Sequence, residues 1–164
     1  MHNKKEKDDI IQEIQKDLTG LNISPRDAVM LMREASYWVD DCAKYICTRT
    51  NKLDDPLMCF VKNNCLYLVN RSYSTIMYAP KIMFHFKEPG HLHIDDILMK
   101  TNDIGNGSVA MEALLKYAIK SGVHVITGDL SSIDDDHKNR RDHYYAKFGF
   151  DNHTTYVIKH LSER

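Results

Sequence analysis

The first third of the chain carries its apolar residues at helical spacing. Ile10, Ile14 and Leu18 lie about one turn apart and predict a helix that ends at Gly20. Ser24-Pro25 is typical of the start of a second helix, because serine caps the first amides and proline fits the first turn. This second helix, continuous or broken, is predicted to reach about residue 48 through one apolar face: Ala28, Met32, Ala35, Val39, Ala43 and Ile46.

From residue 57 onward the pattern changes to that of strands. Two apolar runs, 57–61 and 65–69, flank Lys62-Asn63-Asn64, which is typical of a hairpin turn. A third run over 75–86, interrupted by Pro80, and a fourth over 91–99 are separated by a Pro-Gly turn. We expect these last two runs to form a second hairpin.

The remainder of the chain alternates between strand and helix. A glycine loop precedes a helix that Gly122 ends, and a short strand follows over 123–127. Strand, loop, helix and strand in this order predict a βαβ unit with a right-handed crossover. Asp134 is predicted to cap one more helix, Gly149 to end it, and residues 154–161 to form the last strand. The fold class is therefore α/β (α+β): a mixed, mostly antiparallel sheet with helices on both faces and one parallel βαβ unit.

Composition limits the function classes that need to be considered. A chain of 164 residues with 43% hydrophobic and 27% charged residues is expected to fold as one domain, without a metal or disulfide as a staple. Lys and Arg number 22 against 23 Asp and Glu, which argues against general nucleic-acid binding. No apolar run is long enough for a membrane span, and the first residues do not resemble a signal peptide. We therefore expect a cytoplasmic protein with reduced thiols at Cys42, Cys47, Cys59 and Cys65.

The fourth strand changes phase in its middle. Its apolar side chains fall on even positions at Leu92 and Ile94, and on odd positions at Ile97 and Met99. Asp95-Asp96 stands where the phase slips, which indicates a β-bulge, and bulges gather near active sites. A strand end that is buried on both faces is the alternative interpretation.

The loop after this strand has a pattern that suits an anion. Asn102-x-x-Gly105-x-Gly107 leads from strand to helix, where backbone amides and the helix N-terminus can hold a pyrophosphate. The spacing is neither that of the dinucleotide fingerprint nor that of the P-loop. It resembles the acetyl-CoA motif Q/R-x-x-G-x-G/A of the GNAT superfamily, the Gcn5-related N-acetyltransferases. The run from Tyr144 to Phe150 is similar to that family's second landmark, an aromatic-Tyr pair followed by Gly-Phe.

The resemblance extends over about residues 91–150 and implies an acetyl-CoA-dependent N-acetyltransferase. It implies that 91–150 form the acetyl-CoA-binding core and that the helical residues 1–55 lie on the acceptor side. Tyr145 matches the tyrosine that protonates the leaving thiolate, and Asn139 stands one position from an asparagine of the family. The cofactor contacts implied by the motif and the preceding strand are Ile97, Leu98, Met99, Asn102, Ile104, Gly105, Asn106, Gly107 and Ser108.

Direct transfer to a primary amine also requires that the amine lose a proton, because its pKa is about 10.4. Asp96 at the phase slip is the first candidate base, followed by Asp95 and His93; a solvent-facing acidic pair is the alternative. His91 and His93 share a strand face and could bind a metal, but no third ligand has suitable spacing, so we predict no metal site.

The partner expected from this chemistry is a small-molecule or peptide amine, with neither nucleic acid nor membrane involved; a homodimer is left open. Lys138, Arg140 and Arg141 could meet a CoA phosphate or form a solvated helix face. A GNAT-like module that binds acyl-CoA and regulates without turnover is the alternative function.

Overall fold

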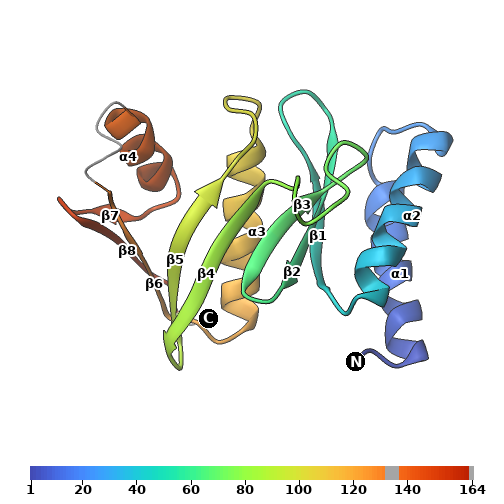
Figure 1. The fold of residues 1–164 in the computed structure, drawn as a ribbon, viewed down its shortest axis with the longest axis horizontal. Coiled ribbons are helices and arrows are strands. Elements are labelled where there is room, and N and C mark those ends of the chain that lie inside the picture. Colours follow the sequence, from blue (N-terminus) through green and yellow to red (C-terminus); the bar gives the residue numbers. More distant parts are fainter. Residues whose placement is uncertain (132–136, 163–164) are drawn as a thin grey trace. The chain divides into compact units, whose positions relative to one another are not determined.

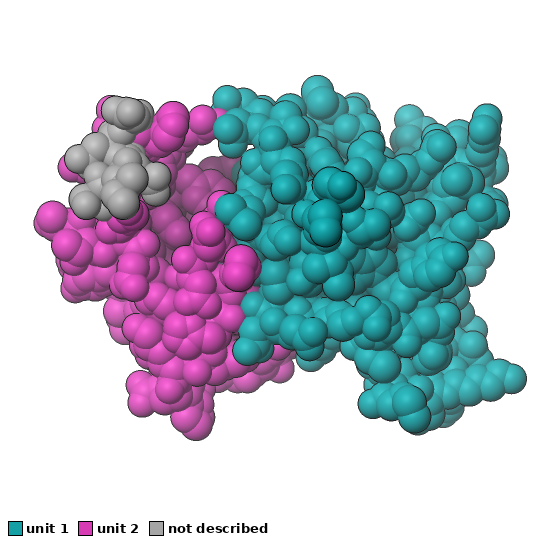
Figure 2. Space-filling view, in the orientation of Figure 1, with its two compact units in different colours: residues 1–82, 98–114 teal, residues 83–97, 115–164 magenta. Residues whose placement is uncertain are grey.

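The computed structural model describes residues 1–131 and 137–162. The chain forms two compact units, residues 1–82 with 98–114 and residues 83–97 with 115–164, shown in teal and magenta in Figure 2. We describe each unit by itself.

Two capped helices open the first unit. Helix α1 spans Lys4–Thr19, and the side chain of Asn3 accepts a hydrogen bond from the Glu6 amide at 2.9 Å. Helix α2 spans Pro25–Asp40 with proline in its first turn. As the sequence predicted, the Ser24 hydroxyl oxygen caps this helix by accepting from the Asp27 amide at 3.1 Å.

The second helix is shorter than the apolar pattern predicted. It ends at Asp40, and residues 44–50 form strand β1 (Lys44–Thr50), so the expectation of helix to residue 48 is wrong. The turn depends on Cys42, which has a positive φ of 61°, and on a bond from the Ala43 amide back to the Trp38 carbonyl at 2.9 Å. Ala43 and Ile46 are both buried, but Ala43 lies in the turn before β1 and Ile46 lies in the strand, so neither extends the helix.

Strand β1 pairs with β2 (Pro56–Lys62), which pairs with β3 (Cys65–Val69), and both pairings are antiparallel. The predicted β2–β3 hairpin is confirmed, and Asn63 and Asn64 take the positive φ values of its two-residue turn. Helices α1 and α2 pack on one face of these strands (Figure 1), where Trp38 contacts Phe60 and Tyr67 at ring distances of 5.6 and 5.0 Å. The interior residues of β2 and β3 are buried, so both faces are covered.

The second unit contains most of β4 and β5 and all of the later strands. Their order is β4 (Lys81–Glu88), β5 (His91–Leu98), β6 (Val125–Asp129), β8 (Tyr156–His160) and the two-residue β7 (Asp151–Asn152). β5 pairs with β6 in parallel, as the βαβ pattern predicted, and β6–β8 and β7–β8 are antiparallel. The run over 75–86 becomes strand only from Lys81, after Pro80, and β7 was not predicted.

Two helices follow β5 in the chain. Helix α3 spans Asn106–Lys120, and Gly122 follows it with φ 74°. Its Tyr117 contacts Phe84 of β4 at 5.7 Å within the second unit. Helix α4 spans Lys138–Lys147 and is followed by Gly149 with φ 75°. The predicted capping residue Asp134 lies outside the described residues. Along the described chain, the predicted mixed and mostly antiparallel α/β fold is confirmed.

Candidate functional site

The glycine loop lies against the connection between β1 and β2 in the first unit. The Lys52 amide donates to the Ile104 carbonyl at 2.8 Å. Gly105 has φ 89°, and a Cβ there would stand 3.1 Å from Lys52 Cγ and 3.2 Å from its amide nitrogen. A side chain at this position would therefore strain the backbone and crowd Lys52, which explains the first glycine of the motif.

The same connection fixes the orientation of a buried asparagine pair. Asn51 Oδ1 accepts from the amides of Leu53 at 2.9 Å and Asp55 at 3.1 Å. Asn51 Nδ2 must then be the atom that donates to Asn106 Oδ1, at 3.0 Å. The orientation of Asn106 follows in turn, and it leaves Asn106 Nδ2 as a buried donor with no hydrogen-bond partner among the described residues.

This unpaired donor lies at the N-terminus of α3. Asn106 is the first residue of that helix and is 1% exposed. A buried donor without a partner costs about 1–3 kcal/mol, and a helix N-terminus attracts an anion. Gly107 and Ser108 in the same turn are half-buried, and Asn102 is exposed. Residues 102–108 therefore fit a phosphate group, with Asn106 Nδ2 as a donor that the sequence motif did not single out.

In the second unit, β5 continues beyond its partner. The parallel register with β6 ends at Ile94↔Gly128, whereas β5 runs on to Leu98 and the next residue of β6, Asp129, pairs with β8. Leu98 is exposed, and Ile97 is half-buried. The edge of β5 from Asp95 onward thus lacks a partner in β6 and can pair with an extended ligand chain.

Both predicted carboxylates of β5 already have partners. Asp96 Oδ1 accepts from the Ile97 amide at 2.8 Å, and Asp95 Oδ1 lies 2.8 Å from His85 Nδ1. The Asp96 side chain therefore already accepts from the Ile97 amide. The bulge at Asp95-Asp96 stays a prediction, because the recorded β5–β6 register, which is regular, stops at Ile94.

Tyr145 lies on the buried side of α4. It is 6% exposed and packs edge-on against Phe150 at 5.2 Å. Burial raises the pKa of Tyr145 to about 12, with Arg141 lowering it and Asp96 raising it. The hydroxyl is therefore protonated near neutral pH, and within the described residues it makes no hydrogen bond.

The other predicted residues of α4 are less enclosed. Tyr144 contacts Phe148, four residues further along the chain, at a ring distance of 5.4 Å. Asn139 is exposed in the first turn, and Arg141 donates to the Ser131 carbonyl at 2.9 Å.

A histidine cluster is the feature that sequence reasoning resolved least. His91 Nε2 and His93 Nδ1 both contact Thr127 Oγ1, at 2.7 and 2.8 Å. His93 Nε2 lies 3.3 Å from Asp129 Oδ2. The His-x-His spacing was visible in the sequence, but Thr127 enters only through the parallel register, which places it opposite His93. No group of three or more metal-binding side chains was found in the described part of the chain.

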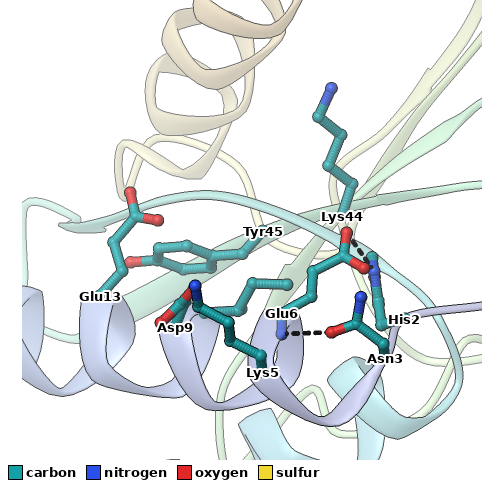
Figure 3. A pocket seen from close by; sticks show the side chains of 9 residues that line it. His2, Asn3, Lys5, Glu6, Asp9, Glu13, Lys44 and Tyr45 are labelled. Carbon is teal, nitrogen blue, oxygen red and sulfur yellow. Dashed lines mark hydrogen bonds and ion pairs between the residues drawn. The ribbon is translucent and has the colours of Figure 1, made fainter.

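A hollow of about 760 Å³ lies beside α1 in the first unit (Figure 3), and none of the predicted site residues lines it. Its wall combines the His2–Glu6 ion pair with Lys5, Asp9 and Lys44. Because its wall carries charges of both signs and the hollow is open to solvent, it does not favour one chemical class of ligand.

Comparisons with known proteins give only structural likeness. No family model and no curated protein matches the sequence. Ard1 from Thermoplasma volcanium has a TM-score of 0.48 and 12% identity, over 61% of this chain and 72% of that one. A protein described as a GNAT-family acetyltransferase, from Desulfovibrio desulfuricans, has a TM-score of 0.43 and 8% identity, over 93% and 92%.

The resemblance expected from the sequence therefore rests on two runs of this chain, the glycine loop before α3 and Tyr145 before Gly149-Phe150. Among the described helices, none combines the length and apolar character that crossing a membrane requires.

Proposed function

We propose that the protein is an acetyl-CoA-dependent N-acetyltransferase that moves an acetyl group directly to a primary amine. The observation that carries the proposal is Asn106 Nδ2, a buried and unpaired donor at a helix N-terminus within a GNAT-like glycine loop. A pyrophosphate oxygen would accept from this atom and remove the cost of leaving it unpaired. The open edge of β5, which precedes the loop in the chain, suits the extended pantetheine arm.

Each residue of the proposed site has a separate task. Gly105 lets the loop approach Lys52, and Asn51 holds the amide of Asn106 in its donating orientation. The Ile97 amide exchanges its bond to Asp96 for one to the ligand, where it can polarise the thioester carbonyl. In the reaction the amine nitrogen bonds to the carbonyl carbon, the carbon–sulfur bond breaks, and the amine proton goes to a base.

Tyr145 serves the leaving group in this proposal. Its pKa of about 12 lies above the value of about 8.5 for an ordinary thiol. The hydroxyl therefore stabilises the developing thiolate chiefly as a hydrogen-bond donor, and the thiol takes its final proton as it leaves the site. Losing one such donor or acid lowers turnover by about 10²-fold in typical enzymes.

One observation favours the alternative, a regulatory module that binds acyl-CoA without turnover. Asp95 and Asp96 are both engaged, with His85 and with the Ile97 amide, so neither stands free as the base. The test combines binding with turnover. Acetyl-CoA should raise the melting temperature more than NAD or ATP does, and a panel of primary amines should accelerate CoA release. Binding without turnover on any amine would favour the regulatory module, and equal stabilisation by all three ligands would exclude both readings.

A further inference from the structure

The turn that joins β1 to β2 is closed by its own hydrogen bonds. Asn51 Oδ1 accepts from the amides of Leu53 at 2.9 Å and Asp55 at 3.1 Å, and the Asn51 amide donates to the Asp55 carbonyl at 3.1 Å. None of these bonds uses the side chain of Lys52, which is exposed. We call residues 51–55 the lysine turn. Its shape therefore does not depend on the side chain at position 52.

Two successive residues of the lysine turn contact the glycine loop. Asn51 Nδ2 donates to Asn106 Oδ1 at 3.0 Å, and the Lys52 amide donates to the Ile104 carbonyl at 2.8 Å. The Lys52 stem also passes close to the loop, because a Cβ built on Gly105 would stand 3.1 Å from Lys52 Cγ. The glycine therefore makes room for the stem of a lysine that lies 53 residues earlier in the chain.

The ammonium group of Lys52 can reach an anion at this loop. Three bonds of about 1.5 Å lead from Cγ to Nζ, so Nζ lies at most about 4 Å from Cγ. The ion pairs among the described residues do not include Lys52. The neighbouring Asn51 contacts Asn106, the residue whose buried Nδ2 has no partner in the described part of the chain. A cation and an unpaired donor thus stand close to the same helix N-terminus.

The charges of the two segments show why a cation matters here. Residues 102–108 contain no lysine or arginine and one acid, Asp103. The lysine turn adds Asp54 and Asp55, so Lys52 is the single cation of both segments against three acids. A helix N-terminus supplies about half a positive charge, and the carboxylates repel a phosphate. Lys52 offsets that repulsion at the place where the turn contacts the loop.

We propose that Lys52 is a cofactor-binding residue whose ammonium group pairs with the pyrophosphate of acetyl-CoA. This inference rests on the proposed acetyltransferase function and adds to the glycine loop a ligand from a distant part of the chain. Lysine suits the task, because it is a compact charge with three N–H donors on a flexible stem. The main-chain bond from Lys52 to Ile104 is present whatever the side chain is, so substitutions at position 52 leave the loop anchored.

The test is a calorimetric titration of acetyl-CoA at low and high salt. Lys52→Met keeps an unbranched stem and removes the charge, and Lys52→Arg keeps the charge. We expect Lys52→Met to raise the Kd about tenfold at low salt, and Lys52→Arg to keep most of the affinity. The matched control is Lys16→Met, which removes an exposed charge on α1 and should bind like the wild type.

Salt separates a charge contact from a structural role. The screening length falls from about 10 Å at 0.1 M salt to about 3 Å at 1 M, so the difference between wild type and Lys52→Met should shrink at 1 M. A loss of affinity that is the same at both salt concentrations would overturn the proposal. Melting curves without ligand check the fold, and Lys52→Gln takes the place of Lys52→Met if the latter does not fold.

The ligand can also be varied to show which phosphate Lys52 contacts. CoA without its 3′-phosphate keeps the pyrophosphate, so Lys52→Met should weaken its binding by the same factor as for CoA. An effect that disappears with this ligand would assign Lys52 to the 3′-phosphate and overturn the proposal. Equal Kd values of wild type and Lys52→Met for acetyl-CoA would also overturn it, and would leave the proposed function intact.

Inorganic pyrophosphate distinguishes failure of this inference from failure of the proposed function. If the wild type binds pyrophosphate and Lys52→Met binds it more weakly, Lys52 is confirmed as an anion-binding residue. If the same wild type does not bind acetyl-CoA, the proposed function is overturned while the anion site stands. A wild type that binds neither ligand would overturn both.

Discussion

The unpaired donor of Asn106 gives the sharpest prediction about the proposed cofactor site. Asn106→Asp is close to isosteric and changes one atom from donor to acceptor. Oδ1 can still accept from Asn51 Nδ2, so the buried pair is kept. In the free protein, the helix N-terminus stabilises the new carboxylate, whereas burial at 1% exposure destabilises it. These two effects on the stability of the folded protein oppose each other. We therefore expect a folded variant.

Asn106→Asp should weaken acetyl-CoA binding much more than it changes the stability of the fold. A hydrogen bond to a charged partner contributes about 1.5–3 kcal/mol. At 1.4 kcal/mol for each factor of ten, its loss raises the Kd for acetyl-CoA by about 10- to 150-fold, and repulsion between the carboxylate and phosphate adds to this. Calorimetric titration measures the Kd, and a melting curve without ligand checks the fold.

The matched control is Asn22→Asp, which adds the same charge at an exposed position outside the glycine loop. It should bind acetyl-CoA like the wild type. If Asn106→Asp folds and binds acetyl-CoA with wild-type affinity, the donor does not face a phosphate and the main support of the proposed function is lost. If the aspartate variant does not fold, Asn106→Ala, which removes the donor without adding charge, takes its place in the same titration.

Three further predictions concern the backbone strain at Gly105, the role of Tyr145 toward the leaving group, and the pH dependence of stability through His93. Gly105→Ala should destabilise the protein more than Gly122→Ala, because both have positive φ but only at Gly105 would the Cβ lie 3.1 Å from another residue; chemical denaturation compares them. Tyr145→Phe should lower turnover about 10²-fold and leave acetyl-CoA affinity within a few-fold, whereas unchanged turnover would reduce Tyr145 to a packing role. Because the pKa of His93 is lowered on folding from 6.5, the unfolded chain binds the extra proton, so the free energy of unfolding should fall as the pH drops below about 6.5. His93→Gln should flatten this dependence in pH-resolved melts, and an identical slope in both proteins would contradict the burial argument.

Local chemistry explains why much of the fold could be predicted. The cap at Ser24, the turn at Asn63-Asn64 and the glycine loop before α3 depend on hydrogen bonds and φ angles within a few residues. The prediction was wrong at β1, because the apolar residues there fit the spacing of a helix as well as that of a strand. Ala43 and Ile46 continued the helical face, and only the turn at Cys42 and pairing with β2 made the segment a strand.

The candidate site also has a part that could be predicted from local sequence and a part that depends on contacts between distant residues. The glycine loop, Tyr145 and the His-x-His spacing could be located from the sequence, because each lies within a short run of residues. The tertiary structure alone decided that Asn51, 55 residues before Asn106, orients its amide. It alone placed Thr127 between two histidines, through a register of parallel strands that a helix separates in the chain. Hydrogen bonds between such distant residues depend on which strands pair and where the pairing begins, and these are set by packing of the whole sheet rather than by any local run of sequence.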